Sequence, residues 1–472
     1  MTIANDIIRS RMPEFDFYLQ QGESLDDIDE YGFTPLIECA IMQDLKIAEA
    51  LLARGVNVNK PDVTGRTALH WAIDNNNLEF ARLLLKNGAN ANAYTSAGLS
   101  ILVYPLLRAQ NNIKHLLYQH NAKIDFALDF INGKLLGHRF ELKGYVDIVN
   151  GDNEFIELDY EGFILEFTVA IVRDSLRRFT SSFSTRHMRQ YFPYLNHITD
   201  SLAVASELLQ FQLTPQLGEQ QKRRISQFLQ LPMLILPAAS RGHALGFVKF
   251  GDFWAKIDRG ENSLKEGSVN IYRMAKKDNF NLNFIENFLY KKQSRAYFHE
   301  QINQELGLVP VLQLPISSQI TGNCSWANIQ AIIPAAYVMQ ELTYDGLSET
   351  TVNTAVELYK QWVEWDQDRA LDECIHRFYL ADPIRKASFA AMLGAVLFQA
   401  CDYDKPHHIE WAEKILPVLT KSDYYYILQS YLDVYCIKRL TRRGNNLLKI
   451  LDDCGFNPQI NVTAIATGLK KE

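Results

Sequence analysis

The sequence lacks the short motifs that mark several large enzyme classes. It contains no P-loop, no glycine-rich dinucleotide-binding turn after a strand, and no HExxH zinc motif. Its six cysteines are widely scattered and none forms a CxxC pair, which argues against a disulfide framework and against a structural zinc site. We therefore expect reduced thiols in a cytosol-like compartment, and neither a cofactor nor a metal ion.

Long apolar runs and an excess of positive charge are also absent. The longest apolar run, near Phe389–Cys401, is too short to span a bilayer, and the first residues lack the charged-then-apolar pattern of a secretory signal. Lys and Arg total 48 against 55 Asp and Glu, which gives a formal net charge of −7. The composition thus predicts no membrane insertion and no direct binding to nucleic acid, and it predicts that any export uses a non-Sec route.

The chain does contain enough apolar material for several cores. Of its 472 residues, 47% are hydrophobic and 22% are charged, as in ordinary soluble globular proteins. A chain of this length is expected to form two or three domains. Three different patterns along the sequence indicate where those domains lie.

The first pattern is a repeat of 33 residues near the N-terminus. Two sets of glycines follow this period: Gly22, Gly55 and Gly88, and Gly32, Gly65 and Gly98. Thr34-Pro35 and Thr67-Ala68 are placed to begin inner helices, and the glycines of the first set are placed to end outer helices. One such unit cannot bury its apolar face alone, so we expect the units to stack into a short solenoid.

The segment Gly65–Ala72, with Gly88–Asn92 behind it, closely resembles the ankyrin consensus. The resemblance covers residues 1–126, in about four units, and implies a platform that binds another protein. Contacts in such stacks usually come from the hairpin tips and the concave inner helices. The tip residues predicted to bind a partner are Lys60, Asp62, Tyr94 and Thr95.

The second pattern is a change of periodicity beyond the repeats. Alternation of apolar and polar residues predicts half-buried strands at 139–142, 145–149 and 155–158, and we read His138 as structural. From about residue 345, apolar residues recur at three-to-four spacing, which predicts helices. The clearest helical stretches are 351–366, 383–400, 408–419 and 423–440.

The third pattern is a set of residues suited to thiol chemistry. His243 begins a strand-like run, and a second run ends at Asp258 after a turn near residue 251. If the two runs form a hairpin, His243 lies opposite residue 258 or 259, so the carboxylate of Asp258 can reach the imidazole. A carboxylate in that position fixes the histidine tautomer and stabilises the imidazolium.

Cys324 follows a run of small and polar residues and precedes the helical run Ile329–Met339. A cysteine at a helix N-terminus is favoured as thiolate by unpaired backbone amides and by the helix dipole. Gln319 lies five residues upstream. Its side-chain amide could donate to an oxyanion together with the backbone N–H of Cys324.

The run from Gln319 through Gly322 and Cys324 to Trp326-Ala327 resembles the nucleophile segment of papain-like cysteine peptidases. The chain order His, Asp, Gln, Cys resembles instead the Ulp/adenain/YopJ-like clan, which includes ubiquitin-like proteases and acetyltransferases. The sequence departs from that clan at Asn323-Cys324-Ser325, where Asp-Cys-Gly is usual. The resemblance implies an α+β multidomain protein, with a papain-like cysteine-protease-like α+β domain over residues 127–344 between the ankyrin solenoid and a C-terminal helical cap domain over 345–472.

Ankyrin repeats combined with a cysteine-protease-like segment resemble the ankyrin-bearing Dot/Icm effectors of Legionella. That resemblance implies type IV translocation, action in the cytoplasm or nucleus of a host cell, and a host protein as partner. Two functions are open. The Cys324-His243-Asp258 site, assisted by Gln319, performs thiol-dependent hydrolysis or acyl transfer, or the chain is a non-catalytic interaction effector with a degenerate cysteine-protease-like platform.

Overall fold

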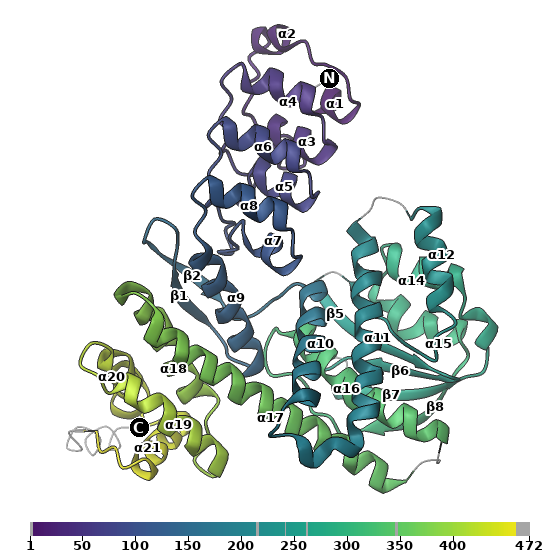
Figure 1. Ribbon diagram of the computed structural model, residues 1–472, viewed down its shortest axis with the longest axis vertical. Helices are drawn as coiled ribbons and strands as arrows, with labels where there is room; N and C mark the ends of the chain where they lie inside the picture. Colours follow the sequence, from purple (N-terminus) through teal and green to yellow (C-terminus); the bar gives the residue numbers. More distant parts are fainter. Residues whose placement is uncertain (1–2, 214–216, 241, 261–262, 345–347, 459–472) are drawn as a thin grey trace, which may run out of the picture.

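The computed structural model describes residues 3–213, 217–240, 242–260, 263–344 and 348–458. Figure 1 shows three parts: a stack of short helices at the N-terminal end, a unit with a central sheet, and a bundle of helices at the C-terminal end. Along the described ranges, no helix is both long enough and apolar enough to cross a membrane.

The N-terminal stack consists of short helices joined by tight turns, in the order α1 Ile3–Ile8, α2 Phe15–Gln20, α3 Pro35–Met42, α4 Leu45–Leu52, α5 Ala68–Asp74, α6 Leu78–Lys86, α7 Val103–Leu107 and α8 Asn111–Gln119. The side chain of Thr34 accepts a hydrogen bond from the N–H of Ile37, as an N-cap should. Thr67 and His70 form a reciprocal capping box at the start of α5. His70 is therefore a structural residue.

The 33-residue period has a conformational origin. Gly22, Gly55 and Gly88 adopt φ values of 85°, 78° and 87°, and Asn121 takes the next position of the period with φ 63°. Positive φ ends each outer helix, and it costs glycine little while asparagine tolerates it better than most residues. The repeat is thus set by the chain reversal after each outer helix.

A long helix and a hairpin follow the stack: α9 Ile124–Arg139, β1 Tyr145–Val149 and β2 Phe155–Asp159, the two strands being antiparallel. The predicted strand at 139–142 is wrong. Arg139 is the last residue of α9, and the N–H groups of Phe140 and Leu142 bond back to carbonyls of α9. Phe140 and Leu142 are buried at 4% and 1% exposure, so a helix end hides both apolar side chains that suggested an alternating strand.

The sheet unit has an antiparallel sheet of order β3-β5-β6-β7-β8, with β4 beside β5. Its strands are β3 Met233–Ile235, β4 Ala238–Ser240, β5 His243–Phe250, β6 Phe253–Ile257, β7 Val269–Met274 and β8 Leu308–Leu314. Its helices are α10 Leu165–Ser181, α11 Phe192–Gln210, α12 Glu219–Phe228, α13 Ser263–Glu266, α14 Leu282–Tyr290, α15 Ile302–Glu305 and α16 Cys324–Tyr344. Short 3₁₀ and π segments are Arg186–Tyr191, Phe211–Leu213, Lys277–Asn279 and Tyr297–Gln301.

The two faces of this sheet bury separate cores. On one face Val248, Ala255 and Ile271 pack with α10, α11 and α16. On the other face Phe247 and Trp254 pack with α12, α14 and the π-helical segment. Adjacent strand residues therefore point into different cores, which is why this sheet is apolar on both sides.

The C-terminal helices are α17 Glu349–Leu380, α18 Pro383–Gln399, α19 Pro406–Leu419, α20 Tyr425–Leu432, a π-helical turn Asp433–Ile437, and α21 Arg442–Asp453. The first half of α17 packs in the sheet unit, and its second half packs in the C-terminal bundle. The core of that bundle is continuous with the core of α9, β1, β2 and the N-terminal stack. The bundle is thus joined to the repeats by a shared apolar core and to the sheet unit by α17 (Figure 1).

A buried ionic network fixes α9, α10 and α17 together. Asp366 on α17 has a side chain only 1% exposed and accepts hydrogen bonds from Nε of Arg139 at 2.6 Å and Oγ of Ser175 at 2.7 Å. Arg369 donates to the same carboxylate at 2.8 Å. Removing one partner from such a network leaves an uncompensated buried charge, which costs about 3–5 kcal/mol.

Candidate active site

His243 and Asp258 meet at one end of the neighbouring strands β5 and β6, where β5 begins and β6 has just ended. The register pairs Gly246 with Ile257. If this pairing is continued toward the start of β5, His243 lies opposite residue 260, one position beyond the predicted 258 or 259. The carboxylate of Asp258 nevertheless reaches the ring, with Oδ1 2.9 Å from Nε2 of His243. Asp258 is 3% exposed, so the pair is sheltered from water on the carboxylate side.

Cys324 is the first residue of α16, as the sequence predicts. Its Sγ accepts a hydrogen bond of 3.3 Å from the backbone N–H of Ala244, the residue after His243. The thiol also lies near the imidazole of His243, close enough for each group to shift the pKa of the other. Because Asp258 occupies Nε2, Nδ1 is the ring nitrogen left for the thiol. Cys324 is partly exposed, so a small reagent can reach the sulfur.

The electrostatics of this trio favour an ion pair. The hydrogen bond to Asp258, followed by that to Cys324, raises the pKa of His243 to about 9 despite partial burial. Burial alone would raise the pKa of Cys324, but the hydrogen bonds from His243 and Ala244 and the imidazolium charge outweigh it, so the pKa of the thiol is lowered. A thiolate beside an imidazolium is the reactive state of a cysteine nucleophile.

Sequence reasoning missed Asn328, which lies one turn along α16 from Cys324. Its side chain is fully buried, and its Nδ2 donates to the carbonyl of Ala244 at 2.6 Å. Its Oδ1 accepts from the backbone N–H of Arg259 at 2.7 Å. Asn328 therefore holds the strand residue next to His243 and the residue next to Asp258 against the helix that carries Cys324.

Two further residues that the sequence did not reveal surround Asp258. The backbone N–H of Gly260 donates to Oδ1 at 2.9 Å, and a Cβ on Gly260 would lie 2.7 Å from Cε1 of His243. Nε2 of the buried His299 lies 3.5 Å from Oδ2. Burial opposes ionisation of Asp258, but these neighbours and His243 lower its pKa, so the carboxylate stays charged.

Gln319 lies beside the same loop, since its backbone N–H donates to the carbonyl of Arg259 at 2.8 Å. Its Oε1 is buried and has no hydrogen-bond partner among the described residues. The oxygen end of the amide is therefore turned inward. Arg259 also donates to the carbonyl of Ser317 at 2.8 Å, which fixes the chain upstream of Cys324.

The four predicted partner-binding residues differ in their surroundings. Asp62 is 5% exposed and accepts hydrogen bonds from the backbone N–H groups of Thr64 and Arg66 and from the indole of Trp71. Thr95 is 7% exposed, and its hydroxyl accepts from backbone N–H groups of its own turn. Both side chains build hairpin tips. Lys60 and Tyr94 are the two that reach solvent.

Comparison with known proteins places the whole chain in one family. A family model for ankyrin repeats matches three copies within residues 12–95 and 55–127. The solved structure of the Legionella effector AnkH is 67% identical, covers 98% of this chain and 99% of its own, and superposes with a TM-score of 0.83. The chain belongs to the AnkH family. The predicted ankyrin repeats and mixed α/β multidomain architecture are confirmed.

Two curated relatives match a short part of the chain. Inversin from Homo sapiens is 46% identical over 65 residues, which is 14% of this chain and 6% of inversin. Neurogenic locus notch homolog protein 1 from Mus musculus is 46% identical over 59 residues, or 12% of this chain and 2% of that protein. The chain thus spans about 6% of the length of the inversins that it matches.

Proposed function

We propose that this chain is an effector that acts inside a host cell, where the repeats bind a host protein and Cys324 performs thiol-dependent hydrolysis or acyl transfer. One observation carries the catalytic part: His243 hydrogen-bonds to the buried carboxylate of Asp258, and the N–H of the next residue, Ala244, donates to the thiol at the first position of a 21-residue helix. Membership of the AnkH family supports the effector part, and the ankyrin repeats support a protein partner.

In the proposed reaction the thiolate of Cys324 attacks a carbonyl carbon, and the carbonyl electron pair moves onto oxygen as the S–C bond forms. The side-chain amide of Gln319 and the backbone N–H of Cys324 donate to that oxyanion. When the intermediate collapses, the bond to the leaving amine or alcohol breaks and the imidazolium of His243 supplies its proton. Neutral His243 then takes a proton from water or from an acceptor nucleophile, which attacks the thioester and releases Cys324.

The proposal extends to the architecture. A papain-like cysteine-protease-like domain over residues 127–344 would carry the site, and a helical cap domain over residues 345–472 would lie beside it. The sheet, the helix that begins at Cys324, and the order His243, Asp258, Gln319, Cys324 support this assignment. Of the tip residues, Lys60 and Tyr94 are the candidates for direct contact with the partner because their side chains reach solvent.

The test is a search for an acyl-enzyme. Wild type and Cys324→Ala are incubated with fluorogenic peptide, isopeptide and ester substrates, and intact protein is examined by mass spectrometry for an added acyl group. The proposal predicts turnover and an adduct on Cys324 in the wild type only. If neither occurs while both proteins capture the same host partner, the catalytic assignment is wrong and the chain is an interaction effector.

A further inference from the structure

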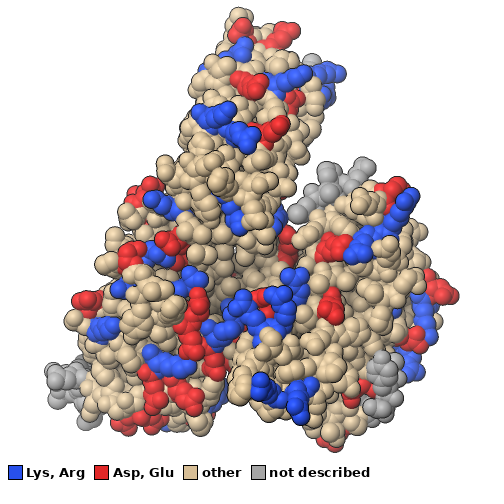
Figure 2. Space-filling model, viewed as in Figure 1, with Lys and Arg blue, Asp and Glu red and all other residues tan. Residues whose placement is uncertain are grey.

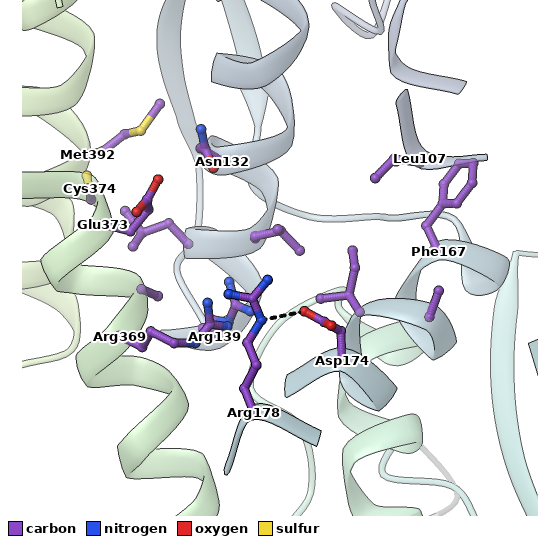
Figure 3. Close-up of a pocket in the computed structure, with 15 residues that line it drawn as sticks. Leu107, Asn132, Arg139, Phe167, Asp174, Arg178, Arg369, Glu373, Cys374 and Met392 are labelled. Atoms are coloured by element: carbon purple, nitrogen blue, oxygen red, sulfur yellow. Dashed lines mark hydrogen bonds and ion pairs between the residues drawn. The ribbon is translucent and has the colours of Figure 1, made fainter. Parts of the chain in front are cut away.

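A cavity of about 380 Å³ lies where α9, α10, α17 and α18 come together (Figure 3). It is far from being a simple gap in the core, because its wall combines apolar side chains with three arginines, Arg139, Arg178 and Arg369. Its volume falls at the small end of the range for small-molecule sites. None of its lining residues belongs to the candidate active site, so a ligand bound in this cavity would be independent of the proposed function.

The three guanidinium groups converge at one end of this cavity, as Figure 3 shows. Their side chains form a gradient of exposure: 7% for Arg139, 33% for Arg369 and 60% for Arg178. The depth of the cavity thus runs from an exposed arginine at the mouth to a buried one inside. Like charges brought together in this way favour an anion between them.

The carboxylates near the arginines already take part in hydrogen bonds and ion pairs. Asp366 accepts from Arg139, Arg369 and Ser175 at the same time. Asp174 accepts from Nε of Arg178 at 2.7 Å and also from Arg177 at 2.7 Å. Glu373, which lines the cavity, forms an ion pair of 2.7 Å with Arg377, which does not. Guanidinium donors therefore outnumber the carboxylate oxygens that face them.

In these pairs Arg139 and Arg178 each donate through Nε alone. Their terminal Nη groups are left to donate to a ligand that brings acceptors. Carboxylate and phosphate oxygens are the acceptors that arginine binds best.

The remainder of the wall is apolar. Leu107, Phe167 and Met392 lie away from the arginines in Figure 3. Leu135 and Ile171 also line the cavity. In the space-filling view, Lys and Arg side chains gather near the centre of this face, over the position of α10, with acidic side chains beside them (Figure 2). A basic surface around the mouth would attract anions from solution.

We propose that this cavity binds a small anionic amphiphile, in which a carboxylate or phosphate group is joined to a short aliphatic chain. The acidic group lies among Arg139, Arg178 and Arg369 and accepts from their guanidinium groups. The chain lies against Leu135, Phe167 and Ile171. A free acid and a phosphate monoester share this chemistry, and the experiment distinguishes them.

Isothermal titration calorimetry on the full chain uses octanoate, octyl phosphate, octanol and inorganic phosphate as probes. The proposal predicts that octanoate or octyl phosphate binds, that octanol binds at least about tenfold more weakly, and that inorganic phosphate alone also binds more weakly. The stronger of the two acidic probes identifies the head group. Equal binding of octanol would overturn the anionic assignment, and equal binding of inorganic phosphate would overturn the amphiphile.

Two matched variants locate the site. Arg178→Ala removes the guanidinium at the mouth and should weaken the acidic probe about tenfold or more. Arg177→Ala removes a neighbouring arginine that binds the same Asp174 but does not line the cavity, and it should change the affinity by less than about twofold. Ile171→Glu should abolish binding of the acidic probes. Failure of every probe to bind the correctly folded wild type, or equal loss in both arginine variants, would contradict the proposal.

Discussion

The side chain of Asn328 accepts a 2.7 Å hydrogen bond from the backbone N–H of Arg259, the residue that follows Asp258. The same side chain donates to the carbonyl of Ala244, the residue that follows His243. One buried amide on α16 therefore sets the positions of the two chain segments that carry the acid and the base. The geometry of the candidate site depends on this residue although these hydrogen bonds go to the backbone and not to the three reacting side chains.

Replacing this amide should disturb the site at a distance. In Asn328→Leu, the carbonyl of Ala244 and the N–H of Arg259 lose their partner, and each unsatisfied group costs about 1–3 kcal/mol. We expect a lower urea midpoint and slower alkylation of Cys324 at neutral pH. Gln340→Leu is the control, since Gln340 is another buried amide on α16, bonded to His197 and to the carbonyl of Ala336. It should lower stability without changing alkylation; equal alkylation in both variants would contradict the positioning role.

Gly260 should tolerate no side chain. A Cβ there would lie 2.7 Å from Cε1 of His243 and 3.0 Å from Oδ1 of Asp258, so Gly260→Ala must push the ring or the carboxylate aside. We expect alkylation of Cys324 at neutral pH to fall about tenfold, as the thiolate fraction decreases. Gly218→Ala is the matched control because its nearest atom would be 3.7 Å away. A wild-type rate in Gly260→Ala would show that the His243–Asp258 contact is not needed.

The Asp366 network predicts a dependence of stability on pH. Burial opposes ionisation of Asp366, but the charges of Arg139 and Arg369 and the hydrogen bonds outweigh it and lower its pKa. A carboxyl with a lowered pKa stabilises the fold above its unfolded pKa of about 3.9 and loses that contribution as the pH falls through the folded pKa. Asp366→Asn should therefore reduce the free energy of unfolding by about 3–5 kcal/mol at pH 7, and by less below about pH 4. Urea titrations of both proteins from neutral to acidic pH measure this difference.

The sequence was sufficient to predict features that depend only on residues close together in the chain. The glycine period follows from single backbone positions, and the placement of Cys324 at a helix start follows from the run of small residues before it. The hairpin argument predicted the contact between Asp258 and His243 although its register was off by one residue. The contact still forms because the side chain of Asp258 spans the difference.

What the sequence could not supply are contacts between distant segments. Asn328 and His299 have no local feature that sets them apart from other buried polar residues, and they act on Asp258 and its neighbours only once the sheet and α16 are assembled. Phe140 and Leu142 suggested a strand because a helix end buried on two sides has the same apolar spacing. Asp62 was predicted to contact a partner because the sequence does not show that its carboxylate accepts hydrogen bonds from its own turn. Those bonds form only when the turn folds.

The thiolate–imidazolium pair is tested most directly by iodoacetamide labelling across pH, with the modified cysteine located by mass spectrometry in wild type, His243→Ala and Asp258→Asn. We predict selective labelling of Cys324 with an apparent pKa well below the ordinary value of about 8.5, and a return of that pKa toward the ordinary value in His243→Ala. The wild-type ion pair should persist until His243 loses its proton near pH 9. Labelling of Cys324 no faster than that of Cys374 or Cys436, whose pKa values are raised by burial, would contradict the assignment of Cys324, His243 and Asp258 as a reactive site.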